Sequence, residues 1–439
     1  MAVVNFRAPN RSPYGKKGKD QNGDRGAFRD AEDEIEEEEY GDAPYEDESF
    51  DSGEEEESGS RGGLTRSQRL LLLLRLAVIL CVGAAIVLAL IRQNRRRSYT
   101  ASELRTVAEI SVPEAAACIN LDGKMLIYSK DGASCMDQDG TVLWSVSYEM
   151  QRPMVAVAGS LAAIGDYQGS TVHVLSATAG ETGIISTNMP MRSLSVAQNG
   201  EIAAVLEDSG TAWIYLFDLQ GNTIAYLKRT MEQSGYPVAT ALSPNGALLM
   251  CAQVGVDNAE IKTSVAFYNF GAVGQGETDR LVGGYDYSGE VVPFVRFLSN
   301  DSAVSVSDAG AVFYTGDEKP VSGQTVAFSS PLKGVWTSSE YVGLLFPDPD
   351  GEAAYRLELY SRAGRLVGSI PFTMDFTSIQ ILGERVIIDD GSNVLVSSVT
   401  GNVQFQGSFG DSVLLVLPTA AANRLTLVTR SRIETMILR

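Results

Sequence analysis

A unit of four short strands repeats from residue 98 to the end of the chain, and this repeat limits the fold more than any other feature of the sequence. The units begin near residues 113, 154, 192, 237, 292, 332, 375 and 411. In each unit, short apolar runs alternate with glycine-containing turns at intervals of about ten residues. No stretch has sustained helical periodicity. A period of about 42 residues with four strands per unit is typical of a β-propeller.

The last unit is incomplete, which indicates how the ring closes. Residues 411–439 supply only three strands, and an additional strand-like segment at residues 103–112 precedes the first unit. Pairing that segment with the last unit removes two open sheet edges. We therefore predict an all-β propeller over residues 98–439, with eight four-stranded blades closed by the strand at 103–112. Seven blades is the alternative, if one unit is wrongly drawn.

Residues 1–65 form an acidic tail. They carry 19 Asp and Glu residues against 8 Lys and Arg residues. Few apolar residues and dense like charge favour disorder, so we predict a disordered tail over 1–65. The formal net charge of the whole chain is −20. Because nucleic-acid binding depends on clustered Lys and Arg, this balance argues against a nucleic-acid partner.

An apolar run follows the tail. Residues 66–97 contain seven arginines and no acidic residue, and Leu70–Ile91 is apolar except for Arg75. About 20 apolar residues are enough to span a bilayer. Arg75 lies one turn into the run, where its stem can extend to the interface. We predict one transmembrane helix with arginine flanks over 66–97.

The orientation of this helix rests on two opposing arguments. Three arginines lie shortly before the run and four lie shortly after it, which slightly favours a cytoplasmic C-terminal domain. Export of an acidic tail ahead of an uncleaved anchor is difficult, however. We therefore expect a single-pass plasma-membrane protein, with its tail in the cytoplasm and its propeller outside.

Two repeats carry a resemblance to known families. The stretch "CMDQDGTVLWSV" at residues 135–146 is similar to the quinoprotein-like propeller repeat, and "ALSPNGALLM" at 241–250 resembles a turn of WD40-like propellers, although no "WD" dipeptide occurs. The chain as a whole, with its acidic tail, its anchor and its divergent propeller, resembles an uncharacterised family of membrane-anchored propellers, domain of unknown function 5711. The resemblance implies a fold and a topology but no activity.

Quinone-dependent propeller enzymes enclose their cofactor between a tryptophan and, in many cases, a disulfide of adjacent cysteines. This chain has no adjacent cysteines, and we expect Trp144, Trp213 and Trp336 to be packing residues in three different blades. We read Asp139–Gly140 as a hairpin turn. We predict no cofactor.

The sequence also contains little that indicates a metal site or a hydrolase. The only histidine, His173, lies in a strand-like stretch, and the four cysteines form no CxxC pair. The pairs "DQDG" (Asp137, Asp139) and "DPDG" (Asp348, Asp350) fit ordinary turns better than calcium loops, which need six to eight oxygens. No G-x-S-x-G motif occurs. We expect no metal site and no catalysis.

A binding role is the remaining expectation. The fourth unit is the longest and contains two stretches that we read as long loops, "QVGVDNAEIKT" and "GAVGQGETDRLVGGYDYSG". The second loop holds the candidate partner-binding residues Tyr285, Asp286 and Tyr287, since Tyr is common at interface anchors. The favoured function is an extracytoplasmic module that binds a protein or a cell-envelope ligand. The alternatives are a scaffold subunit of an envelope secretion or assembly complex, and a surface glycan sensor or hydrolase.

Overall fold

The computed structural model describes residues 75–87, 98–230, 234–257, 260–348, 351–419, 421 and 423–439. The predicted disordered tail, 1–65, lies outside these residues. The chain divides into two compact units, Met1–Leu90 and Ile91–Arg439, and each is described by itself.

In the first unit, residues 75–87 form a helix. The two ends of the predicted membrane span Leu70–Ile91 lie outside the described residues. Within the described residues, no helix is both long enough and apolar enough to cross a membrane. The membrane-spanning helix therefore stays a prediction.

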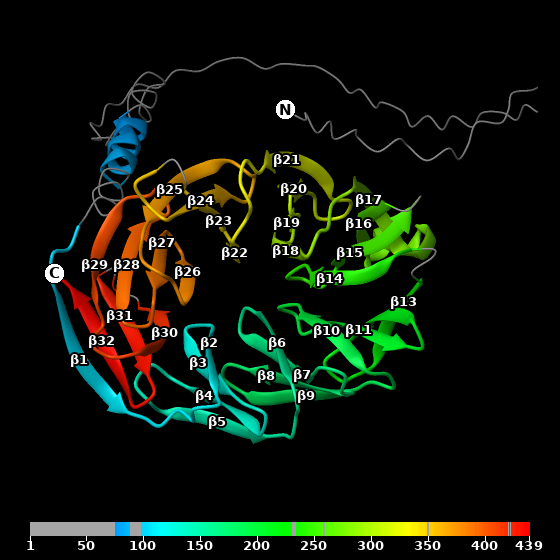
Figure 1. Cartoon of the computed structure of the whole chain (residues 1–439), viewed down its shortest axis with the longest axis horizontal. Helices are drawn as coiled ribbons and strands as arrows, with labels where there is room; N and C mark the ends of the chain where they lie inside the picture. Colours follow the sequence, from blue (N-terminus) through cyan, green and yellow to red (C-terminus); the bar gives the residue numbers. More distant parts are fainter. Residues whose placement is uncertain are drawn as a thin grey trace, which may run out of the picture. The chain divides into compact units, whose positions relative to one another are not determined.

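The second unit is an eight-bladed β-propeller. Its described residues form eight antiparallel sheets of four strands each, arranged around a central axis (Figure 1). The predicted all-β propeller is confirmed, with eight blades and not seven. Seven of the sheets follow the order of the sequence from the innermost to the outermost strand.

The first four blades run from residue 117 to residue 288. Blade 1 contains β2 (Ala117–Leu121), β3 (Lys124–Tyr128), β4 (Gly132–Met136) and β5 (Val142–Ser147). Blade 2 contains β6 (Pro153–Ala158), β7 (Leu161–Asp166), β8 (Thr171–Ser176) and β9 (Gly180–Ser186). Blade 3 contains β10 (Met191–Val196), β11 (Ile202–Asp208), β12 (Thr211–Phe217) and β13 (Thr223–Thr230). Blade 4 contains β14 (Tyr236–Leu242), β15 (Leu248–Asp257), β16 (Glu260–Asn269) and β17 (Leu281–Ser288).

The other four blades complete the ring. Blade 5 contains β18 (Phe294–Ser299), β19 (Ser302–Val306), β20 (Gly310–Thr315) and β21 (Val321–Ala327). Blade 6 contains β22 (Gly334–Thr337), β23 (Tyr341–Pro347), β24 (Tyr355–Ser361) and β25 (Leu366–Phe372). Blade 7 contains β26 (Ser378–Leu382), β27 (Arg385–Asp389), β28 (Asn393–Ser398) and β29 (Val403–Ser408). Blade 8 contains β30 (Val413–Pro418), β31 (Arg424–Thr429), β32 (Arg432–Leu438) and β1 (Ser102–Glu109).

Blade 8 closes the ring with strands from both ends of the propeller. Its strand order is β1-β32-β31-β30, so the strand nearest the start of the domain is the outermost strand of the last blade. The register runs from Ser102 opposite Leu438 to Glu109 opposite Arg432. The closing strand predicted at 103–112 is therefore confirmed, with β1 at Ser102–Glu109.

Burial explains the sequence pattern of the strands. The second strand of each blade is covered on both faces by neighbouring blades and reads as a nearly continuous apolar run, as in β11 and β23. The outermost strands face water on one side and are far more exposed, as in β21. Eight hydrophobic clusters, one between each pair of neighbouring blades, hold the described ring together. The cluster between blades 8 and 1 shows that the ring is packed as well as paired at its closure.

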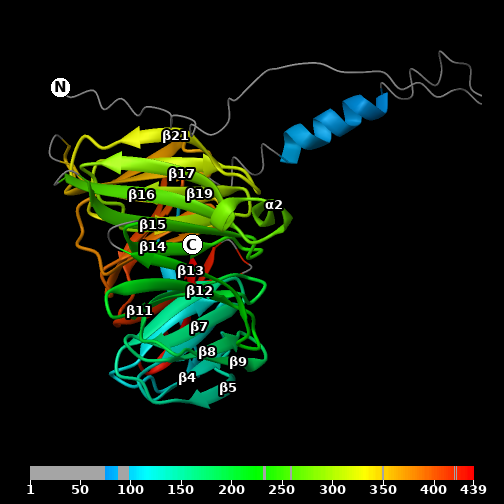
Figure 2. The same cartoon turned by 90° about the vertical axis from the view of Figure 1, so that its right-hand side faces the viewer.

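Blade 4 departs from the expected loops. The stretch "QVGVDNAEIKT" belongs mainly to a long hairpin, because β15 and β16 pair from Leu248–Asn269 as far as Asp257–Glu260. The second stretch contains a short helix α2 (Ala272–Gln275), a 3-10 turn η1 (Thr278–Arg280) and strand β17. Figure 2 shows α2 at one face of the ring. Our reading of both stretches as long loops was therefore wrong for most of their residues.

Candidate functional site

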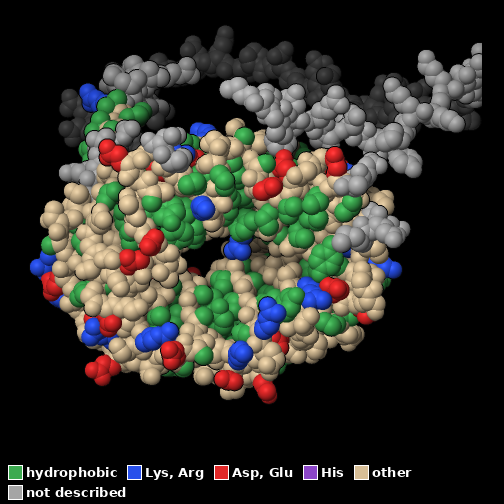
Figure 3. All heavy atoms as spheres, viewed as in Figure 1, with side chains coloured by type: hydrophobic (Ala, Val, Ile, Leu, Met, Phe, Trp, Pro, Cys, Tyr) green, Lys and Arg blue, Asp and Glu red, His purple; other side chains and the backbone are tan. Residues whose placement is uncertain are grey.

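A cavity of about 780 Å³ lies in the middle of the ring. The innermost strands of blades 2 to 5 (β6, β10, β14 and β18) supply most of its walls, with further residues from blades 1 and 6. Each of these innermost strands has a neighbour in its sheet on one side only, so its second backbone edge is free. Figure 3 shows the ring hollowed at its centre, with hydrophobic side chains around much of the opening and basic side chains beside it.

The cavity wall exposes polar and apolar surface in nearly equal parts, with hydroxyl groups and one charge. Among the described residues that line it, Arg296 on β18 is the only charged one. The apolar lining includes Val155, Leu194 and Leu242. Volumes of roughly 300–1,000 Å³ are usual for small-molecule sites, so the cavity is of ligand size.

Arg296 extends across the ring. Its Nη2 donates a hydrogen bond to the carbonyl oxygen of Val157 on β6, at 3.3 Å. Blades 5 and 2 are separated by blades 3 and 4 on the shorter path round the ring. Its side chain is exposed to the cavity, yet the walls that surround it remove part of its hydration and lower the pKa of Arg296. Within the described residues, no carboxylate forms an ion pair with this guanidinium.

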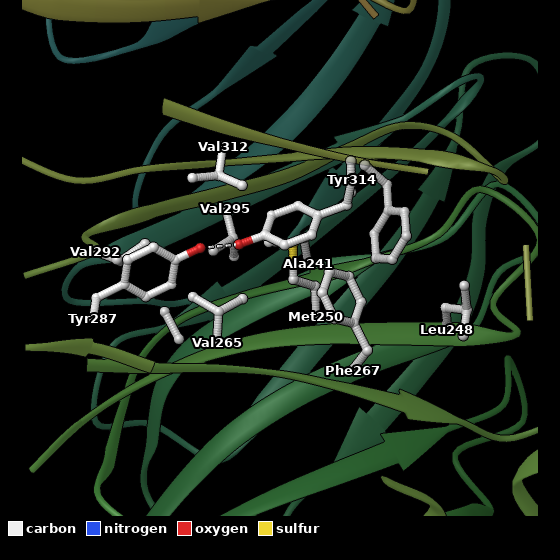
Figure 4. Close-up of a cluster of buried hydrophobic side chains, with 13 residues drawn as sticks. Ala241, Leu248, Met250, Val265, Phe267, Tyr287, Val292, Val295, Val312 and Tyr314 are labelled. Atoms are coloured by element: carbon white, nitrogen blue, oxygen red, sulfur yellow. Dashed lines mark hydrogen bonds between the residues drawn. The ribbon is translucent and has the colours of Figure 1, made fainter. Parts of the chain in front are cut away.

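The predicted partner-binding residues Tyr285, Asp286 and Tyr287 lie on strand β17 and not in a loop. Tyr287 is buried in the cluster between blades 4 and 5, and its hydroxyl is hydrogen-bonded to that of Tyr314 (Figure 4). Tyr285 packs against the same cluster, and its hydroxyl donates to the carbonyl of Pro320 at 2.9 Å. The two tyrosines therefore join neighbouring blades.

Asp286 points the other way, as strand alternation requires. Its carboxylate accepts a hydrogen bond from Ser264 at 2.5 Å and forms an ion pair with Lys262 at 2.9 Å. Both partners lie on the adjacent strand β16. Asp286 is exposed, and its contact with a partner stays a prediction.

A surface of aromatic rings on blade 3 was missed by the sequence analysis. We define the blade 3 aromatic surface as Trp213, Tyr215 and Tyr226. The Tyr226 ring lies 5.9 Å from Trp213 and 5.5 Å from Tyr215, measured between ring centroids. Tyr226 is 59% exposed, and Lys228 Nζ lies 5.5 Å from the centre of the Trp213 ring. Alternation in "TAWIYLF" put Trp213 and Tyr215 on one face, but the sequence did not show that blade 2 leaves that face partly open.

The remaining residues considered for metal or catalytic roles contact only neighbouring protein groups in the part of the chain that the structure describes. Asp137 and Asp139 lie in the turn between β4 and β5 and accept backbone hydrogen bonds, from Gln138 and Thr141. His173 lies on β8, as predicted, with its Nδ1 2.5 Å from Glu181.

The second acidic turn and the cysteines also show no sign of a metal or catalytic site in the described residues. Asp348 forms an ion pair with Arg356 at 2.9 Å, while Asp350 lies outside the described residues. Cys118 and Cys135 lie on β2 and β4, with β3 between them. The described residues contain no cluster of three or more His, Cys, Asp or Glu side chains able to hold a metal ion.

Comparison with known proteins gives a family and a fold. The family model described as "Family of unknown function (DUF5711)" matches residues 94–438. No curated protein sequence matches the chain.

Three solved structures illustrate the fold likeness. The computationally designed protein Ika8 aligns with a TM-score of 0.51 at 12% identity, covering 76% of this chain and 100% of its own. BamB from Moraxella catarrhalis aligns with a TM-score of 0.45 at 15% identity, covering 77% of this chain and 100% of its own. Sqt1 from Saccharomyces cerevisiae aligns with a TM-score of 0.48 at 10% identity, covering 78% and 99%. At such identities the likeness concerns the fold alone.

Proposed function

Because the chain belongs to the DUF5711 family, whose function is unknown, we propose a function from its own surfaces: a non-catalytic binding module that holds a protein partner. In this proposal the propeller is anchored by a single membrane-spanning helix, lies outside the cytoplasm, and leaves the acidic tail inside. The partner binds at the blade 3 aromatic surface.

The observation that carries this proposal is an exposed aromatic ring, Tyr226, beside the half-buried rings of Trp213 and Tyr215 on blade 3. Trp and Tyr dominate the energetic centres of protein interfaces, because they bury a large area at a small entropy cost. Ile224, two residues before Tyr226 on the same strand β13, is also exposed. Grouped exposure of aromatic and apolar side chains is typical of interaction surfaces.

The closed propeller ring is a suitable support for a binding surface. In the described ring, only the innermost and outermost strands of each blade are edge strands, and side chains packed between neighbouring blades hold the blades in place. A surface fixed in this way needs little ordering when a partner binds, which favours affinity.

The test is site-specific photocrosslinking in intact cells. A photoreactive phenylalanine analogue at Tyr226 is expected to capture a defined protein, whereas the same analogue at exposed Gln406 on the outer strand β29 is not. Equal capture at both positions, or none at Tyr226, would contradict the proposal.

A substitution pair makes the same test quantitative. Tyr226 and Leu366 are each 59% exposed on outermost strands, so Leu366→Ala is a matched control for Tyr226→Ala. We expect Tyr226→Ala to weaken partner capture at least about tenfold, as for an interface centre worth roughly 2 kcal/mol, and Leu366→Ala to leave it unchanged. Retention on cell-wall polysaccharide without any captured protein would favour a glycan ligand instead.

Topology needs its own experiment. A reporter that is active only after export, fused behind Arg439, is expected to be active, and a reporter that works only in the cytoplasm is expected to be silent there. The reverse result would place the propeller in the cytoplasm and overturn the proposed orientation.

A further inference from the structure

The central cavity combines a charged group with a wall that is partly apolar and partly polar. Arg296 is the only charged residue among its described lining residues, and the wall around it includes Val155, Val157 and Leu298. Hydroxyl side chains from three innermost strands, those of Ser195, Thr240 and Thr337, complete the lining.

The guanidinium has hydrogen-bonding capacity that the protein does not use. Arginine carries five N–H donors, and the one hydrogen bond that the Arg296 guanidinium donates within the described part of the chain has a donor–acceptor distance of 3.3 Å. Charged hydrogen bonds usually lie at about 2.7–2.9 Å, so this contact is a weak one. The acceptor, Val157, is a neutral backbone carbonyl on the opposite side of the ring.

The Arg296 side chain is exposed to the cavity, and no acidic side chain is among the described residues that line it. A carboxylate that enters the cavity can therefore pair with the guanidinium without displacing another charged side chain. A second polar group of the cavity wall is also unsatisfied, since the buried Oγ of Ser195 has no hydrogen-bond partner in the protein. That oxygen is itself covered, so Arg296 is the group that a ligand in the cavity can reach.

We propose that the central cavity binds a small organic carboxylate, whose anionic group pairs with Arg296 and whose apolar body lies against the valine and leucine side chains. The flat guanidinium matches the two carboxylate oxygens in a bidentate pair. The apolar part of the wall favours a ligand with an apolar body over a small hydrated anion, which has no apolar surface to bury. This site is separate from the blade 3 aromatic surface and does not depend on it.

Binding of hexanoate to the full-length protein tests the proposal. We expect saturable binding of one hexanoate per chain, measured by ligand-observed NMR. Hexanamide has nearly the same shape without the charge, and it is expected to bind at least about tenfold more weakly. Inorganic phosphate has charge but no apolar body and is expected to compete poorly.

Substitutions assign the binding to Arg296. Arg296→Gln is expected to weaken hexanoate at least about tenfold and to leave hexanamide unchanged, while Arg296→Lys retains part of the affinity. Arg365→Gln, in the turn between β24 and β25, is the matched control and should have no effect. An unchanged melting temperature for Arg296→Gln shows that the fold is intact.

The outcomes separate this proposal from the proposed function. Equal affinity for hexanoate and hexanamide, equal loss in Arg365→Gln, or no saturable hexanoate binding up to about 10 mM would overturn the carboxylate site. Tyr226→Ala is expected to bind hexanoate normally. A loss of partner capture in Tyr226→Ala with normal hexanoate binding would support both proposals independently.

Discussion

The hydroxyl of Tyr287 on β17 is hydrogen-bonded to the hydroxyl of Tyr314 on β20, and this contact joins blades 4 and 5 inside their shared hydrophobic cluster. The Tyr314 hydroxyl also lies 3.0 Å from Ser305 Oγ. Tyr314 has no exposed surface, and burial raises the pKa of both tyrosines. A hydroxyl in such surroundings must be hydrogen-bonded, because an unsatisfied buried group costs about 1–3 kcal/mol.

A double-mutant cycle on this pair is expected to show coupling. Tyr314→Phe and Tyr287→Phe should each lower the free energy of unfolding by about 1–2 kcal/mol, since each removes the same shared hydrogen bond. The double variant should lose less than the sum, and urea denaturation measures the difference. Tyr226→Phe, which removes an exposed hydroxyl, serves as the control. Strict additivity of the two single losses would show that the hydroxyls do not cooperate.

Asp389 gives the propeller a predictable pH dependence. It is buried at the end of β27 and accepts a hydrogen bond from the Gly391 N–H at 3.2 Å. Burial raises the pKa of its carboxyl from 3.8 to about 6. The folded state therefore holds this proton more tightly than the unfolded state. The contribution of Asp389 to stability is most favourable below about pH 4 and is lost as the pH rises through about 6.

Asp389→Asn is expected to remove this dependence. At pH 7 the variant should be more stable than the wild type by up to about 3 kcal/mol, the equivalent of the pKa shift, and at pH 4 the difference should vanish. Asp390→Asn is the matched control. Hydrogen bonds from Asn393 and the backbone lower the pKa of Asp390, so its loss should cost stability at neutral pH. Chemical denaturation at both pH values measures the effect, and an equal change for Asp389→Asn at pH 4 and pH 7 would contradict it.

Ring closure through β1 is expected to be essential for stability. Deletion of residues 98–109 leaves β32 without its outer neighbour and opens blade 8 to solvent. We expect a large fall in melting temperature and rapid hydrogen exchange in β30–β32. Glu103→Ala removes ion pairs with Arg105 and Arg439 but keeps the strand ladder, so it should change the melting temperature far less than the deletion does. A deletion variant that melts like the wild type would show that β1 does not hold the ring closed.

The blade architecture could be predicted from the sequence because turn chemistry recurs at each hairpin. Glycines such as Gly140, Gly221 and Gly401 have positive φ angles of 81–89° at corresponding turns, a conformation that favours glycine. Each turn fixes the strands on either side, so the eight predicted starts lie within four residues of the observed ones. The prediction failed in blade 4, where residues 271–289 were interpreted as one long loop but Leu281–Ser288 form strand β17.

The candidate sites were less accessible from the sequence. Alternation alone implies that Tyr285 and Tyr287 share one face of a strand and Asp286 the other, yet the loop interpretation concealed this. Arg296 is visible as one charge inside the apolar stretch "FVRFLS". Its position in the central cavity depends on which blades lie opposite each other, and that follows only from the closed ring.

Gly368 is expected to be needed for contact between blades 6 and 7. It lies on β25, and a Cβ atom there would be 2.4 Å from the backbone carbon of Thr400 in the turn of the next blade. Gly368→Ala should lower the free energy of unfolding by about 1–3 kcal/mol, because backbone atoms must shift to relieve the overlap. Gly383→Ala is the control. Gly383 has a φ of 59° but open space around its Cβ position, so its cost is backbone strain of about 1 kcal/mol without a clash. Urea denaturation of the two variants measures the difference, and a cost for Gly368→Ala no greater than for Gly383→Ala would show that the two blades are not in tight contact at this point.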